Sequence, residues 1–133
     1  MLLLDRVVAA TDHSVTCEVA LTKDFVFLEN GVADVLVCVE LVAQTVRAYV
    51  GLQQREKGEP PQTGFLVGCR NAVFSSDCLR EGEQLIVQAE HVWGDGAFGK
   101  FAGQVERGGV VIASMDVSVV RPDRVGTGLG VGE

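Results

Sequence analysis

The chain has 133 residues, with 11 Lys and Arg against 18 Asp and Glu, which gives a formal net charge of −7. This length suits one domain, and a hydrophobic content of 47% is enough for a core. The acidic balance argues against nucleic acid as a partner, because phosphate binding needs clustered Lys and Arg. No apolar run reaches the about 18 residues of a membrane span, so we expect no membrane association.

The apolar N-terminus MLLLDRVV lacks the basic start of a signal peptide and is interrupted by Asp5 and Arg6. We therefore expect a cytoplasmic protein. The chain has four cysteines and two histidines, without CxxC spacing and without a cluster of metal-ligand residues. We predict no metal and no cofactor, and we expect all four cysteines to be reduced thiols in or near the core.

The first two predicted elements are β-strands in the segments LLLDRVVAAT and SVTCEVALT, which Asp12 and His13 separate at a turn. In the second segment apolar residues alternate with Thr16, Glu18 and Ala20, which is the period of a half-buried strand. The segment KDFVFLENG that follows is predicted to be an irregular loop anchored by its aromatic residues.

A helix is predicted from Ala33 to about Glu56, with Asp34 as its N-cap. Its first part, VLVCVELVA, is apolar on every side, which is typical of a helix surrounded by protein. Glu40 is the one carboxylate in this run, so it is either a working group of an active site or a paired structural carboxylate.

After the Pro60–Pro61 pair come four strand-like segments with turn signals between them, among them GDG and RGG. We expect a domain over residues 1–122 and a flexible Gly-rich tail over residues 123–133. The order of elements predicts an α+β fold in which one antiparallel sheet of about six strands wraps one central helix. Such a sheet covers only one side of the helix, which indicates at least a homodimer.

Three stretches resemble the hot-dog fold family, in particular the beta-hydroxyacyl-acyl-carrier-protein dehydratases and their aryl-polyene-associated branch. LLLDRVV resembles the family's opening strand, and VELVAQTV resembles its helix motif Glu-x-x-Ala-Gln. GFLVGCRNAVFSSDCLREGEQLIVQAE resembles the strand-turn-strand unit that follows. The resemblance extends from Leu2 to about Arg121. It implies a curved sheet around one helix, with two protomers paired edge to edge as a dimer or a dimer of dimers.

The chain departs from these dehydratases in the loop before the helix. There the family carries Gly-His-Phe-Pro-Gly, whose His is the partner acid/base. The equivalent segment here, DFVFLENGVADVLVCVE, contains no His, and Val26 stands at the ungapped position. Asn30 and Glu29 lie in this loop, where ordinary loop chemistry is the simpler interpretation.

The resemblance implies that Glu40 is the catalytic group facing an acyl-thioester tunnel and that Gln44, four residues on, helps to position it. A carboxyl in an apolar tunnel is expected to have a raised pKa, which makes it a usable acid/base near neutral pH. Free N–H groups near Val35 and Leu36 are expected to polarise the thioester carbonyl. Gly64 and Gly68 are expected to let an acyl chain approach the backbone, although tight packing is an equal alternative.

Three functions remain open on the sequence. The first is a dehydratase acting on a 3-hydroxyacyl thioester of acyl carrier protein or CoA. The second is a thioesterase, because a helix carboxylate alone supports thioester hydrolysis in related hot-dog enzymes. The third is a non-catalytic subunit that partners an intact dehydratase, which the missing His favours.

The other polar residues have simpler interpretations. His13 is expected in a solvated turn, and His91 is expected on a strand face that it shares with Trp93. Several basic residues are either a patch for phosphopantetheine or carrier protein, or ordinary surface charges: Arg47, Arg55, Lys57, Arg70, Arg121 and Arg124.

Overall fold

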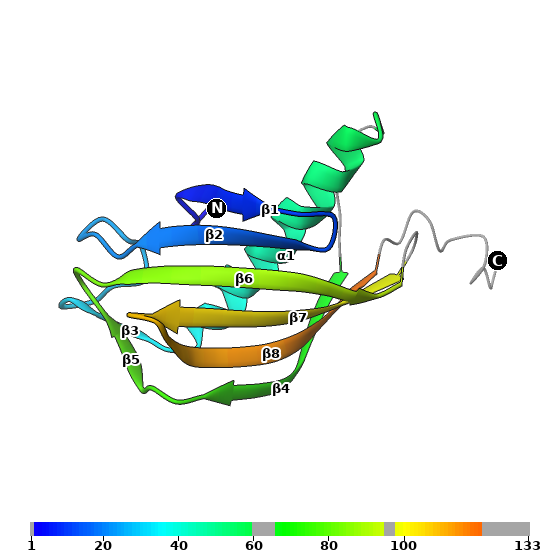
Figure 1. Cartoon of the computed structure of the whole chain (residues 1–133). Helices are drawn as coiled ribbons and strands as arrows, with labels where there is room; N and C mark the ends of the chain where they lie inside the picture. Colours follow the sequence, from blue (N-terminus) through cyan, green and yellow to red (C-terminus); the bar gives the residue numbers. More distant parts are fainter. Residues whose placement is uncertain (1, 60–65, 95–97, 121–133) are drawn as a thin grey trace.

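The computed structural model describes residues 2–59, 66–94 and 98–120. A six-stranded antiparallel sheet curves around one long helix (Figure 1). The sheet has the strand order β1-β2-β6-β7-β8-β4, and β3 and β5 form a separate two-stranded sheet. The predicted α+β hot-dog architecture is confirmed. The elements are β1 (Arg6–Ala10), β2 (Ser14–Ala20), β3 (Val32–Asp34), α1 (Val37–Glu56), β4 (Leu66–Phe74), β5 (Cys78–Arg80), β6 (Gln84–Trp93), β7 (Phe98–Arg107) and β8 (Val110–Val120).

Alternation along the strands builds the concave face of the sheet. In β2 the residues Val15, Cys17 and Val19 are fully buried. Their partners in β6, which are Ala89, Val87 and Leu85, are fully buried as well. Because residues directly opposite in an antiparallel pair share one face, these rows form a continuous apolar surface on which α1 packs.

The helix approaches the sheet closely at β7, where a glycine has no side chain between the two. A Cβ atom on Gly103 would come within 2.3 Å of Val42 Cγ1. Val42 is fully buried, and its branched side chain has little freedom to turn away. The absence of a side chain at Gly103 therefore sets how closely α1 packs against the sheet.

The helix begins later than the sequence predicted, at Val37 and not near Ala33. The residues Val32–Asp34 instead pair with Cys78–Arg80, which forms the small sheet β3–β5. Asp34 is not the N-cap of α1, because that position is Leu36 and no side chain caps it. Asp34 Oδ1 accepts a hydrogen bond from the Leu36 N–H at 2.8 Å, so it stabilises the turn that leads into the helix.

Two tight turns contain residues with positive φ, a backbone conformation that glycine adopts readily. The RGG segment joins β7 to β8, and both Gly108 and Gly109 have positive φ, at 62° and 82°. Asn30 and Gly31 also have positive φ, at 55° and 79°, in a turn that the Glu29–Val32 backbone pair closes. Asn30 and Gly31 therefore have a local structural role in the segment that was predicted to be irregular.

The two edges of the main sheet, β1 and β4, are largely uncovered. Every residue of β1 is exposed, and in β4 the residues from Gly68 to Val73 are exposed. Cys69 lies on this edge, so the expectation that all four cysteines lie in or near the core is wrong for Cys69. All four are free thiols, and Cys17 and Cys38 are buried as expected. In the described part of the chain, no helix has the length and apolarity to cross a membrane.

We predict that Gly103→Ala destabilises the fold by about 1–3 kcal/mol, because the new methyl group overlaps Val42. Urea unfolding measures the loss. The control is Gly51→Ala, since Gly51 lies in α1 with open space around it. Removing a helical glycine there is expected to stabilise by about 0.5–1 kcal/mol. Equal stability of the two variants would contradict the close contact.

Candidate functional site

Glu40 lies in the first turn of α1, beside an open groove of about 490 Å³. Its side chain is 47% exposed. The expectation of a carboxyl enclosed by apolar groups is therefore not met within one chain, because Glu40 faces away from the sheet. The groove is lined by Leu2, Leu4, Glu40, Gln44, Arg47 and Ala48.

The helix is not covered on every side, in contrast to the prediction from its apolar sequence. Glu40, Arg47 and Gly51 form an exposed stripe along α1. Leu36, just before the helix, is 59% exposed. The valines at positions 37 and 39 are only half-buried, although their apolar character matches that of the core.

Gln44 connects Glu40 to the N-terminal segment of the chain. Its Oε1 accepts a hydrogen bond from the Leu3 N–H at 2.7 Å, and its Nε2 donates to Glu40 Oε2 at 3.0 Å. Gln44 is buried, with 8% of its surface exposed. Because the backbone N–H needs an acceptor, the amide oxygen must face Leu3, and its nitrogen then faces Glu40. The amide thus holds the carboxylate in a defined orientation.

Arg47 is the second group in contact with Glu40. Its Nη1 lies 3.6 Å from Glu40 Oε2, and the two side chains are 42% and 47% exposed. An ion pair this open to water contributes little to stability. Among the described residues both side-chain contacts of Glu40 fall on Oε2 and neither on Oε1. The sequence analysis placed Arg47 only in a general basic patch, and its spacing from Glu40 along α1 was the missed signal.

The N–H groups of Val35 and Leu36 are not free in this structure, in contrast to the prediction, and the role of these residues toward a substrate stays a prediction. The Val35 N–H donates to Asp77 O at 3.4 Å, and the Leu36 N–H donates to Asp34 Oδ1. Both bonds follow from the later start of α1, since Val35 and Leu36 belong to the turn that connects β3 to the helix.

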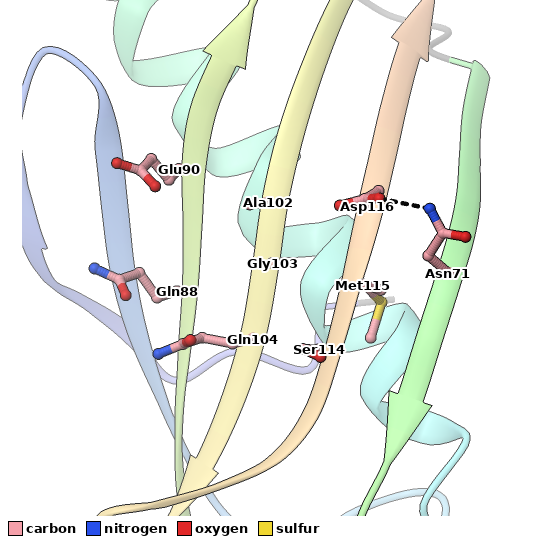
Figure 2. Close-up of a pocket in the computed structure, with 9 residues that line it drawn as sticks. All are labelled: Asn71, Gln88, Glu90, Ala102, Gly103, Gln104, Ser114, Met115 and Asp116. Atoms are coloured by element: carbon pink, nitrogen blue, oxygen red, sulfur yellow. Dashed lines mark hydrogen bonds between the residues drawn. The ribbon is translucent and has the colours of Figure 1, made fainter.

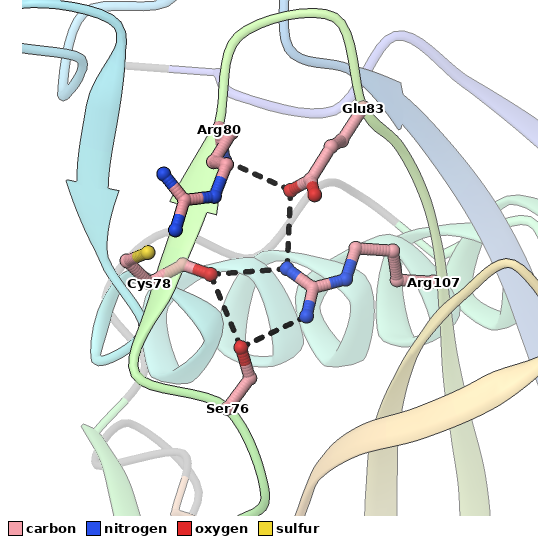
Figure 3. Close-up of polar contacts among 5 residues, drawn as sticks. All are labelled: Ser76, Cys78, Arg80, Glu83 and Arg107. Atoms are coloured by element: carbon pink, nitrogen blue, oxygen red, sulfur yellow. Dashed lines mark hydrogen bonds and ion pairs between the residues drawn. The ribbon is translucent and has the colours of Figure 1, made fainter.

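A half-buried arginine holds the segment that fixes this turn. Arg107 Nη1 donates to Cys78 O at 3.0 Å and lies 3.1 Å from Glu83 Oε1, and its Nη2 donates to Ser76 Oγ at 2.9 Å (Figure 3). Glu83 Oε1 also accepts from the Arg80 N–H. The cluster therefore ties the end of β7 to β5, which pairs with β3.

Burial raises the pKa of the nearby Cys38 thiol to about 11, against a smaller opposing effect of the Arg107 charge.

Both histidines of the chain lie far from Glu40. The backbone N–H of His91 donates to the backbone oxygen of His13 at 2.6 Å. The His91 ring stacks on the Tyr49 ring, with their centroids 5.7 Å apart. Tyr49 is nine residues beyond Glu40 on the same helix, which is roughly 13 Å along its axis. Neither histidine can therefore act together with Glu40 of its own chain.

His91 and Trp93 do not share a face, in contrast to the prediction from simple alternation. The pairing with β7 shifts register between these two residues, which is the mark of a bulge. His91 packs against Tyr49 and Phe101, whereas Trp93 is 62% exposed. Burial, and then the charge of Asp12, raise the pKa of Tyr49, whose hydroxyl donates to Asp12 O at 2.6 Å.

Of the two glycines predicted beside the acyl chain, only Gly68 lies in the described part of the chain, and it does not line the groove. Gly64 lies outside the described residues. Gly68 is part of the edge strand β4, opposite Ser118, and a Cβ atom on it would meet nothing within 4 Å. Within the described residues, no group of three or more His, Cys, Asp and Glu side chains is placed to hold a metal ion.

The profile of the ApeP-like family, described as ApeP dehydratase, matches residues 1–129. The chain belongs to this family. No curated protein matches its sequence. Among solved structures, the dehydratase heterocomplex ApeI:P from Xenorhabdus doucetiae is similar over 99% of this chain and 90% of that chain, with 22% identity and a TM-score of 0.88.

Two further solved structures share the fold at lower similarity. A variant of the phenylacetic acid degradation protein PaaI from Thermus thermophilus is 15% identical with a TM-score of 0.64, over 87% of this chain and 91% of that chain. Zebra fish thioesterase superfamily member 2 is 14% identical with a TM-score of 0.63, over 86% of this chain and 79% of that chain. At these identities the likeness concerns the fold alone.

We predict that Gln44→Met lowers the free energy of unfolding by about 1–3 kcal/mol, because the buried Leu3 N–H loses its acceptor. Amide hydrogen exchange at Leu3 is expected to accelerate in the same variant. The control is Arg47→Met, which removes the exposed ion pair and is expected to cost no more than about 0.5 kcal/mol. Unchanged exchange at Leu3 in Gln44→Met would contradict the link between the N-terminal segment and α1.

Proposed function

We propose that the chain is a subunit of a 3-hydroxyacyl-thioester dehydratase in which Glu40 is the acid/base. The observation that carries the proposal is the position of Glu40. It lies on the uncovered stripe of α1, is held by Gln44 through one oxygen, and opens into a groove with the apolar walls Leu2 and Leu4. Membership of the ApeP-like dehydratase family supports the same reaction.

The reaction needs one proton removed and one proton delivered. A base takes the proton from the α-carbon, the released electron pair forms the double bond, and the β-hydroxyl leaves as water after an acid protonates it. Glu40 Oε1 is the candidate base. The substrate is an acyl thioester on acyl carrier protein or CoA. The start of α1 carries the positive end of the helix dipole, which favours negative charge developing on the thioester oxygen.

A second chain completes the site in this proposal. Both histidines lie at the Tyr49 end of the helix, and Tyr49 is roughly 13 Å along α1 from Glu40, so neither can serve as the acid beside Glu40 of its own chain. The exposed edge β4 offers unpaired backbone groups to another protomer, which is the usual route to an extended sheet. The partner is a second copy, as a homodimer or a dimer of dimers, or a related subunit that carries an intact dyad.

The similar structure from Xenorhabdus doucetiae is a dehydratase heterocomplex, ApeI:P, which supports the mixed alternative, in which this chain pairs with a related subunit. The fold is shared with a thioesterase superfamily member, so thioester hydrolysis is the alternative reaction that the activity assay must separate from dehydration. The four free thiols suit a reducing compartment, and we place the protein in the cytoplasm.

We predict that Glu40→Gln abolishes turnover of a 3-hydroxyacyl thioester, because the amide cannot accept the α-proton. The loss is measured as the fall in kcat relative to the parent chain. Glu90→Gln, at an exposed position on the outer face of the sheet, is the control and is expected to keep full activity. Full activity of Glu40→Gln would exclude Glu40, and free thiol released from a saturated acyl thioester would indicate a thioesterase instead.

The same assay separates the homomeric and mixed alternatives. If the chain acts alone, the purified protein dehydrates the substrate without another subunit. If it partners an intact dehydratase, activity arises only after co-expression with a related subunit and survives Glu40→Gln. In that second case Glu40 has a structural role.

We predict that Val73→Arg on β4 weakens the dimer at least about tenfold, because it places a charge in the paired edge. Analytical ultracentrifugation at several concentrations measures the change. Val110→Arg is a matched control, since Val110 is 62% exposed at the β7–β8 turn and Val73 is 63% exposed. A dimer that is unaffected by Val73→Arg would show that β4 is not the interface.

A further inference from the structure

The groove beside Glu40 contains a cation to which the proposed mechanism assigns no role. The described residues that line this groove are Leu2, Leu4, Ala48, Gln44, Glu40 and Arg47. Arg47 is therefore the only positively charged side chain among them. It is 42% exposed, so a ligand that enters the groove can reach its guanidinium.

The helix directs the side chain of Arg47 toward Glu40. The two residues are two turns apart, which is roughly 10 Å along α1. Long side chains on a helix lean toward its N-terminus, so the side chain of Arg47 extends back toward the carboxylate. Nη1 of Arg47 lies 3.6 Å from Glu40 Oε2, and in the described part of the chain the guanidinium makes no hydrogen bond. Its N–H donors are thus available to a ligand.

The backbone donors at the start of the helix are largely engaged. Four N–H groups there each donate to an oxygen of the chain itself: those of Val35, Leu36, Cys38 and Val39. A thioester bound beside Glu40 would therefore compete with these bonds for a backbone donor. The guanidinium of Arg47 is a charged donor in the same groove and has no such bond to give up.

Removal of the α-proton moves negative charge from one oxygen to another. Before this step the carboxylate of Glu40 carries the charge and the thioester oxygen is neutral. The C–H bond then breaks, the proton goes to Glu40, and the electron pair left on the α-carbon delocalises to the thioester oxygen as an enolate. When the β-hydroxyl leaves as water, the electron pair forms the double bond and the oxygen becomes neutral again. A cation beside both oxygens meets the charge in each state.

Such a cation accelerates the reaction only if it binds the enolate more strongly than it binds the carboxylate of Glu40. The contact with Glu40 is weak, because 3.6 Å is longer than the about 2.7–2.9 Å of a charge-assisted hydrogen bond and both side chains are open to water. A direct hydrogen bond to the enolate oxygen is stronger, since the bound substrate excludes water from the groove. The balance therefore favours the enolate.

The hollow on the outer face of the sheet has carboxylates without such a cation (Figure 2). It measures about 240 Å³, and its described lining contains no Lys or Arg. Glu90 and Asp116 lie there on either side of Ala102, and Asn71 donates to Asp116 Oδ2 at 2.8 Å. An enolate in this hollow would face like charges only. A carboxylate and a cation in contact are what distinguish the groove at Glu40.

We propose that Arg47 is a further catalytic residue, which donates a hydrogen bond to the thioester oxygen and stabilises the enolate. This inference rests on the proposed function, in which Glu40 removes the α-proton. The phosphate of CoA or of a carrier protein lies at the far end of the pantetheine arm from the thioester. A guanidinium 3.6 Å from Glu40 therefore meets the acyl end of the substrate and not the phosphate.

The first test removes the charge and uses a substrate without phosphate, the 3-hydroxybutyryl thioester of N-acetylcysteamine. Arg47→Met is expected to lower kcat at least about a hundredfold and to change KM less than about threefold. Arg47→Lys keeps a positive charge and is expected to recover at least about tenfold of the loss in kcat. If activity requires a related subunit, the variants are assayed in that complex.

The control is Arg80→Met, which makes the same substitution at an exposed arginine of β5. Only the backbone N–H of Arg80 takes part in the Arg107 cluster, so this variant is expected to keep the parental kcat. A parental kcat in Arg47→Met would overturn the proposal. A rise in KM that occurs with the CoA thioester alone would identify a phosphate contact and would overturn it as well.

The second test needs no turnover. The probe is a saturated acyl pantetheine in which a methylene group replaces the sulfur, so its ketone can be neither hydrolysed nor dehydrated. NMR of the isotope-labelled carbonyl carbon reports polarisation, because a stronger hydrogen bond to the oxygen moves this signal downfield. The signal is expected to move downfield on binding to the parent chain and to Arg80→Met, and to move less on binding to Arg47→Met. Equal shifts in all three would contradict the contact.

The two tests separate this inference from the proposed function. An enzyme that dehydrates the substrate with the same kcat in Arg47→Met and in the parent chain would keep the dehydratase assignment and lose the role of Arg47. A protein without dehydratase activity, alone or with a related subunit, whose carbonyl shift depends on Arg47 would keep the contact and lose the assignment. The shift is also expected in Glu40→Gln, because the contact does not require the base.

Discussion

The packing of one helix on one curved sheet constrains everything else in this protein. Six strands spaced about 4.8 Å apart span roughly 24 Å, whereas a helix with its side chains is about 10–12 Å wide. Gly103 lets α1 approach closely at β7, and the four central strands bury their apolar rows beneath it. The helix cannot also cover both edges, so β1 and β4 remain open. The segment that leads into β1 lines the groove beside Glu40, and the edge β4 is open to pairing with a second chain.

The sequence predicted the elements that depend on local pattern. The alternation in β2, the apolar body of α1 and the turn glycines of RGG are all confirmed. The small sheet β3–β5 could not be predicted, because Val32–Asp34 has the same apolar and capping residues that start a helix. Its pairing with Cys78–Arg80 depends on a segment more than forty residues away in the sequence. The bulge at His91 and the exposed Cys69 likewise depend on strand pairing and not on local composition.

The pair Glu40 and Gln44 was predictable from the sequence, but the groups around this pair were not. Glu40 and Gln44 stand in a helix motif, and the structure shows the hydrogen bond between them. Their apolar neighbours suggested an enclosed carboxyl, but an all-round apolar helix does not reveal which stripe the sheet leaves uncovered. The contact of Gln44 with the Leu3 N–H also lay beyond the sequence, because it joins residues 41 positions apart. Contacts of this kind, between residues distant in the sequence, determine how Glu40 and Gln44 are oriented.

A crystal structure of the chain with a non-hydrolysable 3-hydroxydodecanoyl thioether of pantetheine tests the central claim most directly. The claim is that the uncovered stripe of α1 is an acyl-thioester site in which Glu40 is the acid/base. The account predicts that the α-carbon of the ligand lies next to the carboxylate of Glu40, in the groove lined by Leu2 and Leu4. A ligand bound with its reacting end away from Glu40 would contradict it.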